Sequence, residues 1–183
     1  MSKVRSLAAV ALALAIATSP LYAMRQSVEH HSLDAISLLD AMNRERVAHG
    51  LNPLRLNERL TLAATDRVRD MFEKHYFNHT SPDGIDPFRW LDKRGYDYAE
   101  AGENLSVGYA TASDIVDGWM NSPAHRVNVL NKHFDEVGVA IMAASPTSKR
   151  MGPTVVALYG TRRRSIRPLA RLRYADLIRM SAE

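Results

Sequence analysis

The sequence predicts an α+β domain in which helices cover a small antiparallel sheet. Helical periodicity dominates residues 32–130, whereas the alternation typical of strands is clear only between residues 137 and 159. Helices that precede the strands, instead of alternating with them, are typical of this class. The chain has 183 residues and no cysteine. Its core must therefore form by apolar packing without disulfides, and its length suits one domain.

The N-terminal segment predicts export. Lys3 and Arg5 precede an apolar run of eleven residues, Leu7–Ala17, and a short segment that ends in the small residue Ala23 follows. These are the three parts of a signal peptide, and the run is too short for the roughly 20 residues of a membrane-spanning helix. We therefore expect residues 1–23 to be cleaved near Ala23, which would leave a secreted protein, periplasmic or extracellular. An uncleaved N-terminal anchor is the alternative.

Two amphipathic helices are expected next. The first covers residues 32–49, with Ser32 as its N-cap and Gly50 after its end. The second covers residues 57–75, with Asn57 as its N-cap, and repeats apolar residues at spacings of three and four. The other side of the second helix predicts a solvated face, and it contains Asp66, Arg67, Arg69, Asp70 and Lys74.

Shorter elements complete the predicted domain after the turn Pro82-Asp83-Gly84. They are a helix over 86–95, an extended segment over 101–108, helices over 113–120 and 123–130, and strands over 137–141 and 155–159. The two strands are expected to form an antiparallel pair across the loop 145–153. Trp90 and Trp119 lie at helical spacing with apolar neighbours, which favours core packing.

Basic charge is concentrated at the C-terminus. Residues 162–183 contain seven arginines and two acidic residues, whereas residues 24–160 contain 15 basic and 18 acidic residues. No basic folded surface with stacking aromatic residues is evident, so we expect no nucleic-acid partner. The basic tail, residues 162–183, could contact an anionic envelope surface. A solvated tail with no partner is the alternative.

Three residues beside predicted turns or loops are candidates for a shared polar site: His79, Glu103 and His125. Two imidazoles and a carboxylate can bind a divalent metal or perform acid–base chemistry. Their spacings, 24 and 22 residues, do not force them together. In the alternative, His79 bonds its own turn, Glu103 forms a surface ion pair and His125 caps a helix. His133 is a weaker candidate ligand, and His75 is expected at the surface.

Four stretches together resemble the CAP superfamily, which includes cysteine-rich secretory proteins, and in particular its bacterial exported SCP-like branch. The stretches are Leu39–Arg46 followed by Gly50–Leu54, the turn His79–Gly84, Gly102–Leu105, and Trp119–Leu130 followed by Glu136–Val139. Their order and spacing are similar to those of the family from residue 38 to residue 159. The expected CAP domain covers residues 32–161.

The resemblance implies an α-β-α sandwich, with helices on both faces of the sheet and a central cleft that holds two histidines and two acids. His79, Glu103 and His125 match three of these four positions. The fourth, an acid in many members, is Ser122 here, so the site loses one negative charge. Asn104, next to Glu103, is expected with Ser122 at the cleft or directly behind its lining, where Asn104 would tie a loop to the backbone.

The resemblance and the residues lead to two candidate functions. In the first, His79 and His125 bind a divalent metal, with zinc favoured, and the cleft holds a peptide, lipid or cell-wall-derived ligand. Glu103 then hydrogen-bonds an imidazole or a bound water. In the second, the protein is a metal-dependent hydrolase with Glu103 as its catalytic general base. The missing second acid and the absence of Gly-x-Ser-x-Gly and His-Glu-x-x-His motifs favour the first.

Overall fold

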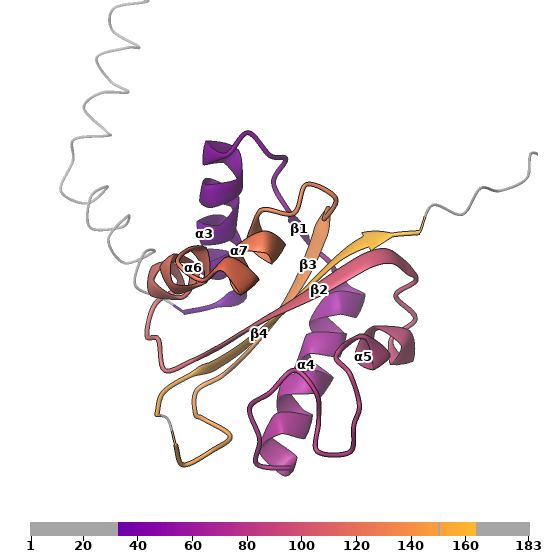
Figure 1. Cartoon of the computed structure of the whole chain (residues 1–183), viewed down its shortest axis with the longest axis vertical. Coiled ribbons are helices and arrows are strands. Elements are labelled where there is room, and N and C mark those ends of the chain that lie inside the picture. The colour runs from indigo at the N-terminus through magenta and orange to yellow at the C-terminus, as the bar shows by residue number, and fades with distance from the viewer. Residues whose placement is uncertain (1–32, 150, 164–183) are drawn as a thin grey trace, which may run out of the picture.

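The computed structural model describes residues 33–149 and 151–163, which form three layers (Figure 1). Helices α3 (Ala35–Ala48), α6 (Ala112–Met120) and α7 (Pro123–Val129) cover one face of a sheet, and helices α4 (Glu58–Glu73) and α5 (Phe88–Lys93) cover the other. The predicted α-β-α sandwich is thus confirmed. The expected signal peptide and most of the basic tail lie outside the described residues.

The sheet has the strand order β1-β3-β4-β2. The strands are β1 (Arg55–Leu56), β3 (Glu136–Met142), β4 (Thr154–Arg162) and β2 (Tyr98–Val107). The expected antiparallel pair of β3 and β4 is confirmed, with Val139 opposite Ala157. β2 pairs with β4, also antiparallel, and starts earlier than expected. The short β1, which the sequence did not predict, pairs with β3 in parallel.

The ends of α3 differ slightly from the prediction. Its N-cap is Asp34, whose side chain accepts a hydrogen bond from the backbone N–H of Ser37, while the Ser37 hydroxyl accepts one from the backbone N–H of Asp34. This reciprocal capping box satisfies two backbone donors at the helix start. The expected cap, Ser32, lies outside the described residues. The helix therefore begins at Ala35.

Helix α4 begins as predicted, because the side chain of Asn57 accepts hydrogen bonds from the N–H groups of Arg59 and Leu60. Its polar side was predicted wrongly. Arg67 is fully buried and Asp70 is 6% exposed, so neither belongs to a solvated face. Arg67 lies three residues after Ala64 and shares its buried stripe. The helical spacing could therefore have indicated this burial.

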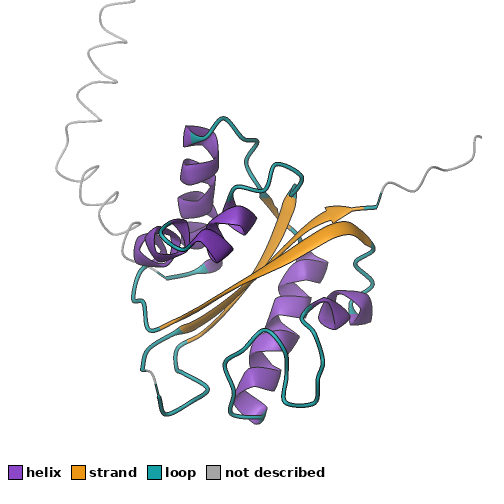
Figure 2. Ribbon diagram, viewed as in Figure 1, coloured by secondary structure: helices purple, strands orange, loops and turns teal. Residues whose placement is uncertain are grey.

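Both faces of the central strand β4 are buried, because helices cover both sides of the sheet (Figure 2). Val155, Ala157 and Tyr159 pack on the α3 side, whereas Val156 and Leu158 pack on the α4 side. The two tryptophans are buried as expected, Trp90 at 7% and Trp119 at 2% exposure.

Helix α4 lies so close to β3 that only a glycine fits at position 138. A Cβ on Gly138 would lie 2.0 Å from the backbone carbon of Leu60. This close approach of the start of α4 to β3 therefore requires a residue without a Cβ. Within the described ranges, no helix combines the length and apolarity required to cross a membrane.

Candidate functional site

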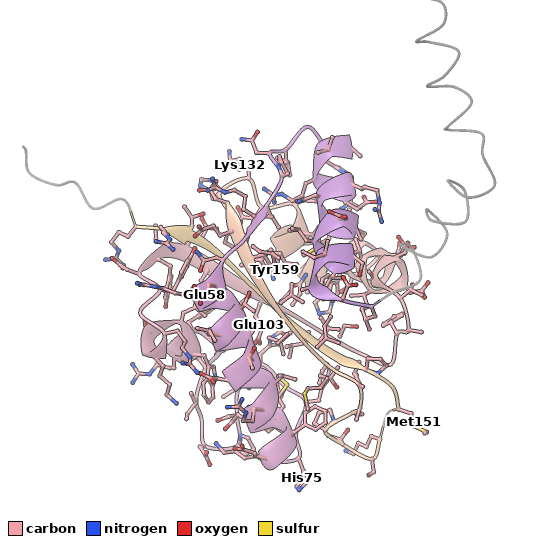
Figure 3. The ribbon with its side chains drawn as sticks, turned by 180° about the vertical axis from the view of Figure 1, so that it is seen from behind. Glu58, His75, Glu103, Lys132, Met151 and Tyr159 are labelled. Carbon is pink, nitrogen blue, oxygen red and sulfur yellow. The ribbon has the colours of Figure 1, made fainter. Side chains whose placement is uncertain are left out.

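Glu103 is a buried carboxylate at the centre of the candidate site. Its side chain extends from β2 beneath α4 and is 2% exposed (Figure 3). Oε2 accepts a hydrogen bond from Nε of Arg67 at 3.2 Å, and Oε1 lies 2.7 Å from Nδ1 of His79. Both oxygens are therefore used within the protein, and the ion pair is buried instead of lying at the surface.

Arg67 joins the buried carboxylate to the loop that holds His79. Its Nη2 donates to the backbone carbonyls of Asn78, at 2.5 Å, and His79, at 2.7 Å. Its Nη1 donates to the hydroxyl of Tyr76. A guanidinium has five N–H donors in a fixed plane, which suits several acceptors at once. Arg67 thus holds the His79 backbone while it compensates the charge of Glu103.

A second buried carboxylate, that of Asp70, supports this arrangement through Tyr76. The hydroxyl of Tyr76 donates to Asp70 at 2.5 Å, and Nζ of Lys74 lies 2.6 Å from the same carboxylate. Burial and the hydrogen bond to Asp70 raise the pKa of Tyr76 to about 12. Tyr76 therefore keeps its proton at neutral pH and continues to donate to Asp70.

The two candidate histidines, His79 and His125, line one cavity of about 410 Å³. The hydrogen bond to Glu103 raises the pKa of His79, although burial and Arg67 oppose this shift. Burial lowers the pKa of His125, and the charge of His79 lowers it further. The two imidazoles are therefore close enough to influence each other electrostatically, and His125 is held mainly in its neutral form at neutral pH.

Two asparagines fix the segments behind this cavity. Nδ2 of Asn104 donates to the backbone carbonyl of His125 at 3.1 Å. Nδ2 of Asn128 donates to the carbonyl of Glu103, at 3.0 Å, and to Oδ1 of Asn104, at 2.9 Å. Asn104 is fully buried and ties β2 to α7. It orients the backbone of His125, and it does not line the cavity.

Two serines add hydroxyl groups to the cavity wall. Ser122 is the N-cap residue of α7, but its side chain makes no capping hydrogen bond. Ser106 is 6% exposed, and its Oγ has no hydrogen-bond partner within the described part of the chain. Ser106 was not selected from the sequence, because a serine in a strand is common. Its inward position on β2 became clear only from the register of the sheet.

The cavity offers two imidazoles as candidate metal ligands. Glu103 holds Nδ1 of His79, which leaves Nε2 as the ring nitrogen able to bind a metal. Among the described residues, no group of three or more His, Cys, Asp or Glu side chains is placed to hold an ion. His133 is 60% exposed, lies 3.8 Å from Glu100, and does not line the cavity. Two imidazoles would leave the remaining coordination positions to water or a ligand.

Comparison of the sequence with known families identifies the family of this domain. The model of the Cysteine-rich secretory protein family (CAP) matches residues 39–159, and the chain belongs to this family. The resemblance predicted from the four sequence stretches is thus confirmed.

Relatives with curated sequences come from Bacillus subtilis. The uncharacterized protein YkwD is 40% identical over 102 residues, which cover 56% of this chain and 40% of YkwD. The uncharacterized membrane protein YlbC is 34% identical over 104 residues, 57% of this chain and 30% of YlbC. The matched region therefore spans less than half the length of either relative.

Solved structures share the fold. An outer surface protein of Borrelia burgdorferi matches with a TM-score of 0.61 and 24% identity, over 73% of this chain and 99% of that one. An extracellular protein of Bacillus anthracis with an SCP domain matches with a TM-score of 0.60 and 23% identity, over 79% of this chain and 44% of that one. At these identities the likeness establishes the fold.

Proposed function

We propose that this protein is an exported CAP-domain protein whose histidine cavity binds a divalent metal, zinc first, together with a peptide, lipid or cell-wall-derived ligand. The observation behind this proposal is that His79 and His125 share a cavity while Glu103 occupies Nδ1 of His79. A carboxylate on one ring nitrogen orients the other and raises its basicity toward a metal. The lowered pKa of His125 keeps that imidazole in the form that binds metals.

The geometry supports binding over hydrolysis. A general base must reach the proton that it removes. Both oxygens of Glu103 are already engaged, one by Arg67 and one by His79, and the carboxylate is buried. Glu103 is therefore better placed to position His79 than to activate a water molecule. Ser122 occupies the position of the family's second acid, and its hydroxyl cannot act as a second carboxylate.

Export is supported by the N-terminal sequence, residues 1–23, and by the extracellular location of the Bacillus anthracis relative. The proposal includes cleavage near Ala23 and attraction of the arginine-rich tail to an anionic envelope surface. Of the seven arginines, Arg162 is the last residue of β4 and lies 3.2 Å from Glu136, and Arg163 lies 3.3 Å from Asp97. Contact with an envelope surface then falls to the five arginines that follow.

Calorimetric titration with zinc tests the metal site directly. The purified protein, stripped of metal, should bind about one zinc ion at neutral pH. The double variant His79→Ala, His125→Ala should lose this binding. His133→Ala is the matched control, because His133 is exposed and lies outside the cavity. Equal binding by the double variant and the wild type would refute the proposed metal site.

A further inference from the structure

A second cavity, of about 740 Å³, adjoins the histidine cavity. Phe77, Asn78 and Val107 line both cavities, so the two meet at these residues. The second cavity extends from His75, after the end of α4, to residues 146–149 in the connection between β3 and β4. Figure 3 shows His75 and Met151, which lies in that same connection, at one end of the molecule. We refer to these two adjoining cavities together as the groove.

The charge of the groove differs from that of the domain as a whole. Its titratable lining residues include His75, His79, His125 and Lys149, and no Asp or Glu is among the described residues that line either cavity. Lys149 has no carboxylate partner within the described ranges. The buried carboxylates behind the lining are already compensated, Glu103 by Arg67 and Asp70 by Lys74. Lys149 thus gives the groove a positive charge that no lining carboxylate offsets, and the groove attracts negative charge there.

Hydrogen-bonding groups are spread along the groove. Ser106 provides a buried hydroxyl without a partner in the described structure, and the Ser122 hydroxyl is not used as a helix cap. Thr147, Ser148 and Asn78 add polar side chains to the other cavity. A buried polar atom without a partner is destabilising, and a ligand with a matching group would offset that cost. Polar groups at intervals suit a polypeptide backbone better than an alkyl chain.

His75 provides an independent observation. It follows the last turn of α4 and has a positive φ of 54°. Among the described residues, it is the one residue other than glycine with a positive φ. Glycine or asparagine is usual at this position of a helix end. Here the position holds an imidazole, and that residue lines the groove.

We propose that the groove binds an acidic stretch of polypeptide. Carboxylate side chains of the peptide would lie near Lys149 and His75, and its backbone would bond to the hydroxyls of Ser106 and Ser122. The inference deepens the proposed function, because the groove includes the histidine cavity. It does not require the metal, since its positive charge comes from protein side chains.

Fluorescence anisotropy with two labelled peptides tests this inference. The first peptide is rich in glutamate and the second has glutamine at the same positions. We expect the glutamate peptide to bind at least about tenfold more tightly at low salt, and salt to reduce the difference. Equal affinity for the two peptides would overturn the inference, as would binding of phosphatidylglycerol vesicles without any binding of the glutamate peptide.

Variants locate the binding. Lys149→Gln and His75→Asn should each weaken binding of the glutamate peptide several-fold, and asparagine keeps the positive φ accessible so that folding is retained. Ser106→Ala should weaken both peptides. The matched control is Lys132→Gln, which makes the same charge change at the opposite end of the molecule (Figure 3). An equal loss in Lys132→Gln and Lys149→Gln would place the attraction in the overall charge and overturn the inference.

The metal and the peptide are tested separately by repeating the titrations with a chelator present. If the protein prefers the glutamate peptide in the presence of chelator and fails to bind zinc in the calorimetric titration, the peptide groove is supported and the metal site is refuted. Zinc binding that depends on His79 and His125, without any preference between the peptides, would do the reverse.

Discussion

Among the described residues, each side of the sheet buries one arginine, and the two arginines differ in what they bind. On the α3 side, Arg46 is 1% exposed, and its hydrogen bonds within the described chain go to backbone carbonyls. Its four acceptors lie at 2.8–3.0 Å, on Asn52, Val129, Asn131 and Phe134. On the α4 side, Arg67 also binds carbonyls, but its Nε donates to the carboxylate of Glu103.

The difference indicates two roles. Arg46 stabilises the fold, whereas Arg67 also supports the candidate site. Arg46 draws the loops around α7 together, and burial lowers its pKa. Arg67 draws the His79 loop onto α4 in a similar way, yet it also compensates a buried negative charge. A carboxylate without such a partner would be too costly to bury beside the cavity. The comparison predicts that only the Arg67 side couples stability to the histidine site.

The largest expected effect is the loss of stability in Arg67→Met. Glu103 would remain buried with only the half-exposed His79 as partner, and breaking a buried pair in this way costs about 3–5 kcal/mol. Adding Glu103→Gln should recover part of this loss, because it removes the uncompensated charge. Urea denaturation measures both changes.

Arg46→Met provides the control for this prediction. It should also lower the free energy of unfolding, because it leaves buried carbonyl groups without donors. Glu103→Gln should bring no recovery in this background, since Glu103 does not bond to Arg46. Recovery of the same size in both backgrounds would show that the two arginines do not differ as we infer.

A smaller effect is expected on zinc binding in Arg67→Lys. The lysine keeps a positive charge near Glu103 but cannot replace the guanidinium contacts with the carbonyls of Asn78 and His79. The looser His79 should bind zinc about tenfold more weakly. Arg46→Lys should lower stability without changing zinc affinity. A similar drop in zinc affinity for both variants, measured by calorimetry, would contradict the distinction.

The smallest effect concerns the protonation of His79. Its pKa is raised by the hydrogen bond to Glu103, so its imidazole keeps a proton to higher pH than an unperturbed histidine. Glu103→Gln should therefore lower the pKa of His79, whereas Arg46→Lys should leave it unchanged. NMR titration of the imidazole resonances, without metal, reports both values. An unchanged or higher pKa in Glu103→Gln would mean that another group sets the proton affinity of His79.

Most of the fold could be predicted because its patterns are local. The apolar spacing of α4 and the alternation in β3 and β4 depend on neighbours within a few residues, and Asn57 caps its helix as expected. The two-residue strand β1 could not be predicted, since both of its residues are exposed and its partner is distant in the sequence. The ends of several helices differ from the prediction by a few residues, because helix termini fray.

The site was harder to predict from residues alone. Spacing did not bring His79, Glu103 and His125 together, and only the family resemblance suggested a shared cleft. Arg67 was missed because its charged neighbours on α4 resemble a solvated face, although its place in the apolar stripe was visible. The periodicity of α4 could indicate that Arg67 is buried, but it could not identify the distant partner, Glu103, that compensates its charge.

The hydrogen bonds to the carbonyls of β2 have a consequence for self-association. β2 is an edge strand, and an open edge invites pairing with strands of other molecules. The side chains of Asn128 and Trp119 donate to the carbonyls of Glu103 and Leu105, and so occupy acceptors that an incoming strand would need. The scaffold that positions the site therefore also guards the protein against aggregation through this edge.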